Sequence, residues 1–321
     1  MRDNDHDYTH GLSPLQRLGY HLLYSLLWFS ALLPLRMLYA INGVFYLLLY
    51  RVVRYRRQMV RRNLRESFPD MSPLELRQTE QRFYHWMCDS IAETTHLARA
   101  TREEMSQRVV YHNLECLDRL IAEGRSVVLY LGHYCNWEWM TTISLHIDMQ
   151  RIVGGQVYHA LENKVVDRVM LRLRSRLGTE CVEMRSILRR IATLRREGKQ
   201  CVFGFISDQT PTYSNTHYWT TLLNHPDTLV ITGTERIARQ ANMACIYLDV
   251  SRPRRGTYEV TLVPMTDKPQ AEPQWGITEQ YIRLLEQTIR RQPHLWLWTH
   301  NRWKRTLQGL RLYQQQHART L

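Results

Sequence analysis

The chain has 321 residues, of which 44% are hydrophobic and 23% are charged. This balance is typical of a globular protein with a sizeable core and excludes a disordered or low-complexity chain. The 43 Lys and Arg residues outnumber the 30 Asp and Glu residues and give a formal net charge of +13. Such a charge favours an anionic partner, which can be nucleic acid, anionic lipid or an acidic protein. The six cysteines are scattered, without a Cys-x-x-Cys motif or metal-ligand spacing, and predict reduced thiols, a cytosol-facing protein and no metal.

A long apolar segment lies near the N-terminus. Residues 21–50 contain a single charge, Arg36, and seven arginines follow: Arg51, Arg54, Arg56, Arg57, Arg61, Arg62 and Arg65. We expect a retained membrane anchor with this basic flank on the cytoplasmic side. At about 1.5 Å per residue, the segment fits either one tilted or kinked span or a helix in the membrane interface. No small-residue cleavage site follows it, which disfavours a signal peptide, and a pair of buried core helices is the alternative.

The body of the chain begins with a helix signal and then alternates between strand and helix patterns. Ser72 is placed as an N-cap, with Pro73 at the first helical position and Glu75 at the third. Apolar runs predict strands at Ser126–Leu131, Arg151–Val157, Cys201–Ile206, Ala244–Val250 and Tyr258–Val263. Helices are predicted at Asn163–Leu177, Arg185–Arg196, Asp227–Gln240 and Thr278–Arg291. This alternation predicts one α/β domain with a mixed, largely parallel sheet.

The stretch VVLYLGHYCNWEWM, Val127–Met140, contains the strongest candidate site. A buried strand ends at a glycine, His133 follows at once, and Glu138 comes five residues later. Ligands of such sheets gather at the carboxyl ends of strands. A neutral His133 there can act as general base toward a hydroxyl, with Glu138 holding its far nitrogen. The alternative is a polar seam where a strand turns into a helix.

The same stretch contains one rival nucleophile. Cys135 lies two residues from His133, a spacing that does not suit a Cys–His pair. No Gly-x-Ser-x-Gly motif is present near it. The pattern therefore favours direct transfer to a hydroxyl over a covalent intermediate.

Four segments carry a resemblance to a known family. Leu131–Trp139, LGHYCNWEW, resembles the His-x4-Asp/Glu signature of the late, or secondary, acyltransferases of lipid A biosynthesis, the lauroyl and myristoyl transferase family. Three further segments resemble motifs of the same family in the same order: SDQTP at Ser207–Pro211, TGTERIARQANM at Thr232–Met243 and QPHLWLWTHNRWK at Gln292–Lys304. Together with the N-terminal anchor, the resemblance extends over nearly the whole chain.

The resemblance implies a fold, an activity and a location. It implies a glycerolipid-acyltransferase type of α/β fold, with a membrane anchor and basic segment over residues 1–65 and an acyltransferase domain over residues 66–321. The implied reaction moves a fatty acyl chain from acyl carrier protein to a hydroxyl of a lipid A precursor, without a metal or nucleotide cofactor. The implied place is the bacterial inner membrane, with the catalytic domain on the cytoplasmic side. No nucleic-acid recognition motif is present, so nucleic acid is not an expected partner.

The resemblance also assigns roles within the site. His133 is implied to be the general base and Glu138 its orienting partner. Arg174 is implied to bind an anionic group or to stabilise the tetrahedral oxyanion, with Arg185 a weaker candidate for the same role. The alternative for Arg174 is a solvated basic helix face shared with neighbouring arginines.

Two further polar residues follow the strand at 201–206. The resemblance implies that Asp208 and Gln209 shape the site from this neighbouring strand end, whereas an exposed turn before Pro211 is the alternative. His300, among tryptophans, is expected to be a structural hydrogen-bonding residue. Two other functions remain open: acylation of another lipid hydroxyl, such as a lysophospholipid or an aminolipid, and a non-catalytic membrane-surface lipid-binding protein.

Overall fold

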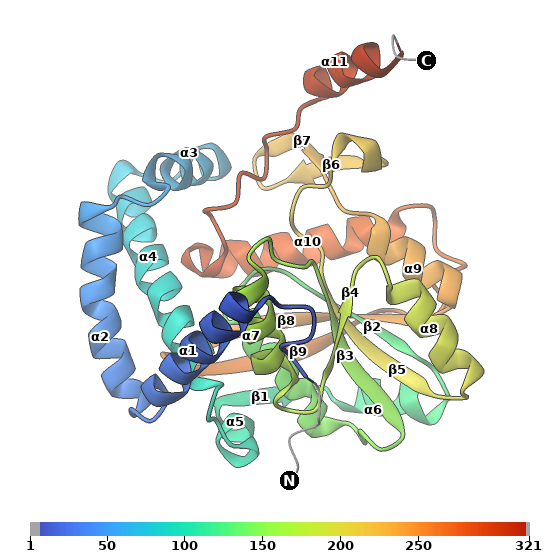
Figure 1. Cartoon of the computed structure of the whole chain (residues 1–321). Coiled ribbons are helices and arrows are strands. Elements are labelled where there is room, and N and C mark those ends of the chain that lie inside the picture. Colours follow the sequence, from blue (N-terminus) through green and yellow to red (C-terminus); the bar gives the residue numbers. More distant parts are fainter. Residues whose placement is uncertain (1–6, 319–321) are drawn as a thin grey trace.

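The computed structural model describes residues 7–318 and is built around one seven-stranded sheet (Figure 1). The strands are β1 (Val109–His112), β2 (Val127–Leu131), β3 (Ile152–Tyr158), β4 (Glu180–Glu183), β5 (Gln200–Ile206), β8 (Ala244–Arg254) and β9 (Thr257–Thr266). Their order is β1-β9-β8-β2-β5-β3-β4, and only the β8–β9 pair is antiparallel. The predicted α/β fold with a mixed, largely parallel sheet is confirmed. Each of the five predicted strands overlaps an observed one.

Helices flank this sheet, and the N-terminal helices pack beside it (Figure 1). They are α1 (Pro14–Ser30), α2 (Leu35–Leu47), α3 (Arg57–Ser67), α4 (Pro73–His96), α5 (Arg102–Arg108), α6 (Glu115–Ala122), α7 (Lys164–Ser175), α8 (Ile187–Arg196), α9 (Gly233–Ala241), α10 (Gly276–Arg291) and α11 (Leu307–Ala318). Shorter turns are the π-helix η1 (Leu48–Val52) and the 3-10 helices η2 (Trp137–His146), η3 (Tyr213–Asn215) and η4 (Pro293–Leu295). The capping box between Ser72 and Glu75 is present, as the helix signal predicts.

One predicted helix is partly wrong. Residues 227–240 do not form one helix, because the hairpin of β6 (Trp219–Leu222) and β7 (His225–Leu229) takes the first part and α9 begins only at Gly233. Contacts from a distant segment hold this hairpin. The Trp303 ring stacks on His225 with 3.7 Å between ring centroids, and its Nε1 donates to Thr228 Oγ1 at 3.0 Å. Local helical periodicity could not include this tertiary packing.

The N-terminal helices pack on the body. α2 lies against α4 and α1 against α7, and Leu35–Val52 is the one stretch of the described residues that is long and apolar enough to cross a membrane. Side chains of this segment, such as Tyr46 and Tyr50, join the main core cluster. The division between an anchor over residues 1–65 and a domain over residues 66–321 stays a prediction.

Candidate active site

Two neighbouring strands bring the candidate residues to one edge of the sheet. β2 and β5 are parallel, with Leu131 paired to Ile206, so His133 and Asp208 follow the carboxyl ends of adjacent strands. The turn that follows β2 is tight. A Cβ atom on Gly132 would lie 2.7 Å from Leu285 Cδ1 and 3.5 Å from Asp208 Oδ2, which explains glycine at this position.

His133 is held by Asp208 at two points. Its Nδ1 lies 2.6 Å from Asp208 Oδ1, and its backbone N–H donates to Asp208 Oδ2 at 3.1 Å. Because an ionised carboxylate only accepts, Nδ1 carries a proton, and in the neutral form of the ring the lone pair is on Nε2. The Gln209 side-chain nitrogen lies 3.3 Å from that Nε2. This arrangement leaves Nε2 as the ring atom that can accept a proton from a substrate hydroxyl.

Asp208 is completely buried and is stabilised as a carboxylate. Oδ2 accepts from Trp296 Nε1 at 2.8 Å and from Arg302 Nη2 at 3.1 Å, and Arg302 Nε donates to the Asp208 carbonyl at 2.6 Å. Burial alone would raise the pKa of the Asp208 carboxyl, but the hydrogen bond and electrostatic attraction of the His133 imidazole, with the Arg302 charge and the Trp296 N–H, outweigh burial and hold that pKa below its usual value. The alternative of an exposed turn at Asp208 is therefore wrong.

The closing aromatic segment also fixes the main chain around His133. The Cys135 N–H donates to the Leu295 carbonyl at 2.9 Å, and the Leu297 N–H donates to the His133 carbonyl at 3.0 Å. Cys135 itself is fully buried with a φ of 52°, and burial raises the pKa of its thiol well above the usual value. A protonated, buried thiol is a poor nucleophile, which disfavours a covalent intermediate on Cys135.

Glu138 does not hold His133, which corrects the expected pairing. Arg174 Nε lies 2.6 Å from Glu138 Oε2, and Arg174 Nη2 lies 2.6 Å from Oε1, a bidentate ion pair in which both side chains are largely buried. Asp208 takes the place on Nδ1. The physical reason lies in η2: the Glu138 N–H is bonded to the Asn136 side chain, and its carboxylate points to α7. Arg174 is thus not part of a solvated basic face.

Trp137 lies between the two pairs. Its ring meets His133 edge-on with 5.0 Å between centroids, and its Nε1 donates to Glu138 Oε1 at 3.0 Å. The structure therefore brings five predicted residues into two adjacent groups, one of His133, Asp208 and Gln209 and the other of Glu138 and Arg174.

Two other basic residues of the sequence analysis make no hydrogen bond to the side chains of these two groups. Arg185 is exposed in the turn before α8, and no hydrogen bond or ion pair joins it to the two groups. His300 is half-buried and accepts the Thr210 N–H at 3.4 Å. Burial, with the nearby Arg302, lowers the pKa of His300 to about 3 and keeps it neutral, in the manner of a structural residue.

Trp296 and Arg302 are the site residues to which the sequence assigned no role. Their segment, Gln292–Lys304, resembles a family motif, but nothing in its sequence indicates which strand end it contacts. The signal was an arginine and tryptophans in an apolar stretch, where a guanidinium requires a buried partner. That partner is Asp208, and the Arg302 guanidinium also lies over the Trp296 ring, 3.6 Å from its centroid.

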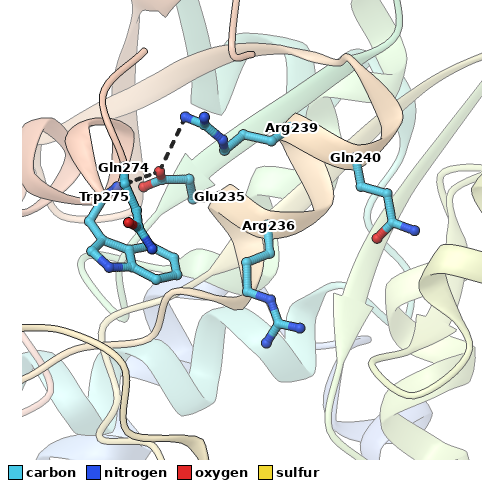
Figure 2. A pocket seen from close by; sticks show the side chains of 6 residues that line it. All are labelled: Glu235, Arg236, Arg239, Gln240, Gln274 and Trp275. Atoms are coloured by element: carbon cyan, nitrogen blue, oxygen red, sulfur yellow. Dashed lines mark hydrogen bonds and ion pairs between the residues drawn. The ribbon is translucent and has the colours of Figure 1, made fainter. Parts of the chain in front are cut away.

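An open pocket between α9 and the loop before α10 involves other residues (Figure 2). Its lining consists of Glu235, Arg236, Arg239, Gln240, Gln274 and Trp275. Glu235 binds the backbone N–H groups of Trp275 and Thr278 at 2.8 Å, so this carboxylate has a structural task. Within residues 7–318, no group of three or more His, Cys, Asp or Glu side chains is placed to hold a metal ion.

The fold and the site define a class. A largely parallel α/β sheet that presents a carboxylate-backed histidine at its strand ends is suited to activating a hydroxyl toward an acyl carbon. Residues 9–305 match the family described as bacterial lipid A biosynthesis acyltransferase, and the chain belongs to this family. It is therefore an enzyme of the lipid A acyltransferase type, and the resemblance drawn from the sequence is confirmed at the level of the family. A comparison with curated proteins finds no match.

Proposed function

We propose that this enzyme transfers a fatty acyl chain from acyl carrier protein to a hydroxyl of a lipid A precursor, with His133 as general base. The observation that carries the proposal is the contact of His133 Nδ1 with the buried Asp208 carboxylate, 2.6 Å away. It leaves Nε2 as the basic atom and stabilises the imidazolium that proton transfer creates. The family supports the substrate class.

The proposed reaction is a single displacement at the thioester carbonyl. His133 Nε2 takes the proton from the acceptor hydroxyl as its oxygen forms a bond to the carbonyl carbon, and the carbonyl π electrons move to the oxygen. The tetrahedral oxyanion then collapses, the carbon–sulfur bond breaks, and the thiolate leaves with the electron pair. The imidazolium returns its proton to that sulfur, so the products are the acylated lipid and a free carrier thiol.

Gln209 and the Glu138–Arg174 pair have proposed supporting roles. The Gln209 amide lies 3.3 Å from His133 Nε2, close to the place where the hydroxyl must sit, and can donate to the oxyanion. Arg174 already shares its charge with Glu138, so its proposed role is to hold an anionic or ester oxygen of the substrate with a fixed guanidinium. Arg185, exposed before α8, remains a weaker candidate for binding an anionic group.

The proposed location is the bacterial inner membrane, with the active site on the cytoplasmic side. The family and the apolar N-terminal helix support a membrane-associated enzyme. The net charge of +13 suits both an acidic carrier protein and a phosphorylated glycolipid. Transfer to a lysophospholipid or an aminolipid is the alternative reaction, and a non-catalytic lipid-binding protein is the second alternative.

The test is transfer by the purified enzyme. Acyl carrier protein charged with a long chain is offered with a lipid A precursor, a lysophospholipid or an aminolipid, and products are identified by mass spectrometry. We expect the lipid A precursor alone to gain one acyl mass. We also expect His133→Ala and Glu138→Ala to lose at least about 10²-fold in rate while membrane association persists.

His112, an exposed histidine on β1, provides the matched control, and His112→Ala should transfer at the wild-type rate. Wild-type transfer by His133→Ala would refute the mechanism. If only a phospholipid is acylated, the lipid A precursor is not the acceptor. If no acceptor gives a product, the result favours the lipid-binding alternative.

A further inference from the structure

The first two helices present an apolar face that the protein itself leaves uncovered. On α1, exposed side chains recur at helical spacing: Leu15, Leu18, Leu22, Leu26 and Phe29. Leu32 continues this face through the turn, and α2 with η1 adds Met37, Ile41, Val44, Leu48 and Val52. Leu15 is 79% exposed and Val52 71%. These eleven residues, named here the apolar face, form a larger set than the isolated apolar residues of an ordinary protein surface.

The opposite side of the same helices is fastened to the body by polar contacts. Tyr39 donates to Glu93 Oε1 on α4 at 2.7 Å, and the Asn42 side chain donates to the Cys88 carbonyl. On α1, Tyr20 accepts from Arg172 Nη1 at 3.2 Å. Helices α1 and α2 therefore lie flat on α7 and α4 with one side each, which leaves only the apolar face for another surface.

A transmembrane position of Leu35–Val52 conflicts with these contacts. The α4 helix under α2 carries the buried carboxylate Glu93 and, one turn earlier, Asp89, whose partners are Arg252 and Arg255. A bilayer-spanning α2 would either break the Tyr39 and Asn42 hydrogen bonds or draw this charged network into hydrocarbon. A buried core helix is equally inconsistent, because only 28% of Leu35–Val52 is buried.

Arginines at the end of the apolar face indicate which surface covers it. Arg51 and Arg54 are exposed, and no ion pair or side-chain hydrogen bond holds them within residues 7–318. Arg36 is exposed at the other end of α2. An apolar helix side bordered by unpaired arginines is complementary to an anionic bilayer, in which acyl chains meet phosphate groups.

We propose that α1, α2 and η1 are an interfacial docking surface that rests in one leaflet of an anionic bilayer and does not cross it. The apolar face enters the boundary between headgroups and acyl chains, and Arg51 and Arg54 bind lipid phosphates. Residues 7–318 thus stay on one side of the membrane. This inference concerns membrane attachment and does not depend on the proposed acyl transfer.

Side-selective labelling distinguishes this mode from a span. His10 and Gln58 are exposed and flank the apolar segment on its two ends. We expect cysteines introduced by His10→Cys and Gln58→Cys, each in the full chain, to react with a membrane-impermeant maleimide from the same side of sealed membrane vesicles. The parent chain, whose own cysteines are mostly buried, gives the background. Reaction of the two positions from opposite sides would overturn the proposal.

Vesicle flotation tests whether an anionic bilayer covers the apolar face. The purified chain should float with vesicles containing phosphatidylglycerol and bind phosphatidylcholine vesicles more weakly. Leu22→Glu and Val44→Glu should each lower binding by about tenfold or more, since each removes an apolar side chain from the lipid. Leu188→Glu, at an exposed apolar position on α8, is the matched control and should float normally.

Arg51→Glu with Arg54→Glu should remove the preference for anionic vesicles and its salt dependence. Circular dichroism of every variant verifies folding. Unchanged flotation of folded Leu22→Glu and Val44→Glu would refute the docking surface. The same result with loss of an oligomer in size-exclusion chromatography would assign the apolar face to a second copy of the chain.

Discussion

Nδ1 of His133 lies 2.6 Å from Oδ1 of Asp208, although 75 positions separate the two residues in the chain. Asp208 is fully buried, and apart from His133 its carboxylate accepts hydrogen bonds from Trp296 and Arg302. The carboxylate that orients the histidine therefore comes from the neighbouring strand and not from the His-x4-Glu stretch itself.

Asp208→Asn should abolish most of the transfer activity. The asparagine amide can donate to Nδ1, which would move the ring proton to Nε2 and remove the base. We expect kcat to fall by about 10²–10⁴-fold. Steady-state kinetics measures the loss, and circular dichroism and the unfolding midpoint separate it from misfolding. A well-folded Asp208→Asn enzyme with wild-type kcat would show that Asp208 has no part in activating His133.

Glu138 and Arg174 should behave as one unit. Glu138→Gln and Arg174→Gln should each lower kcat/KM, and the double variant should be little worse than the weaker single variant, because either change breaks the same bidentate pair. The coupling expected for such a contact is about 0.5–3 kcal/mol. The surface pair Arg190 and Glu180, 2.8 Å apart, offers matched control substitutions that should leave kcat/KM unchanged. Fully additive losses for Glu138 and Arg174 would contradict the pairing.

Cys135→Ala should keep transfer within about threefold of wild type, because a buried, protonated thiol contributes packing and not nucleophilicity. The positive φ at this position is equally strained for both residues. Intact mass spectrometry after mixing with charged carrier protein should reveal no acylated enzyme. An acyl adduct on Cys135, or an inactive but folded Cys135→Ala enzyme, would favour a covalent intermediate.

Arg302→Met should destabilise the protein by about 3–5 kcal/mol, since it removes the charge that compensates buried Asp208. Chemical denaturation measures this free energy of unfolding. Lys304→Met, at an exposed position two residues away, should change it by less than about 0.5 kcal/mol. Equal stability of Arg302→Met and the wild type would mean that the hydrogen bonds from His133 and Trp296 suffice to stabilise the buried Asp208 charge.

The free energy of unfolding should fall as the pH drops from about 7 to about 5. Burial lowers the pKa of His225 to about 4 and of His294 to about 4, and burial with nearby Arg302 lowers that of His300 to about 3, all below the ordinary 6.5. Below pH 6.5 these histidines are therefore protonated in the unfolded chain but stay neutral in the folded chain. The free energy of unfolding falls as a result.

Asp208 affects stability at a lower pH than the histidines, because its stabilising contribution disappears only as the pH falls below 3.8, the usual pKa of its carboxyl. Urea unfolding at several pH values measures how the free energy of unfolding changes with pH. His225→Phe, which preserves stacking on Trp303, should flatten the slope between pH 7 and 5. A stability independent of pH over that range would contradict the lowered pKa values of these half-buried histidines.

Much of this protein is determined by local sequence. The continuous apolar run of β2 indicates a strand buried on both faces, the Ser72 capping box begins α4, and the order of patterns indicates a largely parallel sheet. The position of His133 directly after a buried strand placed it at the sheet edge, and the spacing of four motifs indicated the family. Periodicity, capping and strand ends are short-range properties, which is why a sequence determines them.

The tertiary structure decided which carboxylate meets which base. Glu138 is near His133 in sequence, yet the geometry of η2 directs it to Arg174, whereas the β2–β5 pairing brings Asp208 to Nδ1. Tertiary packing likewise replaced the start of a predicted helix with the hairpin β6–β7 and turned the apolar N-terminal run into two helices that each bury only one side. Hydrogen-bond partners depend on distances of a few ångströms between strands far apart in the chain, and no local pattern contains those distances.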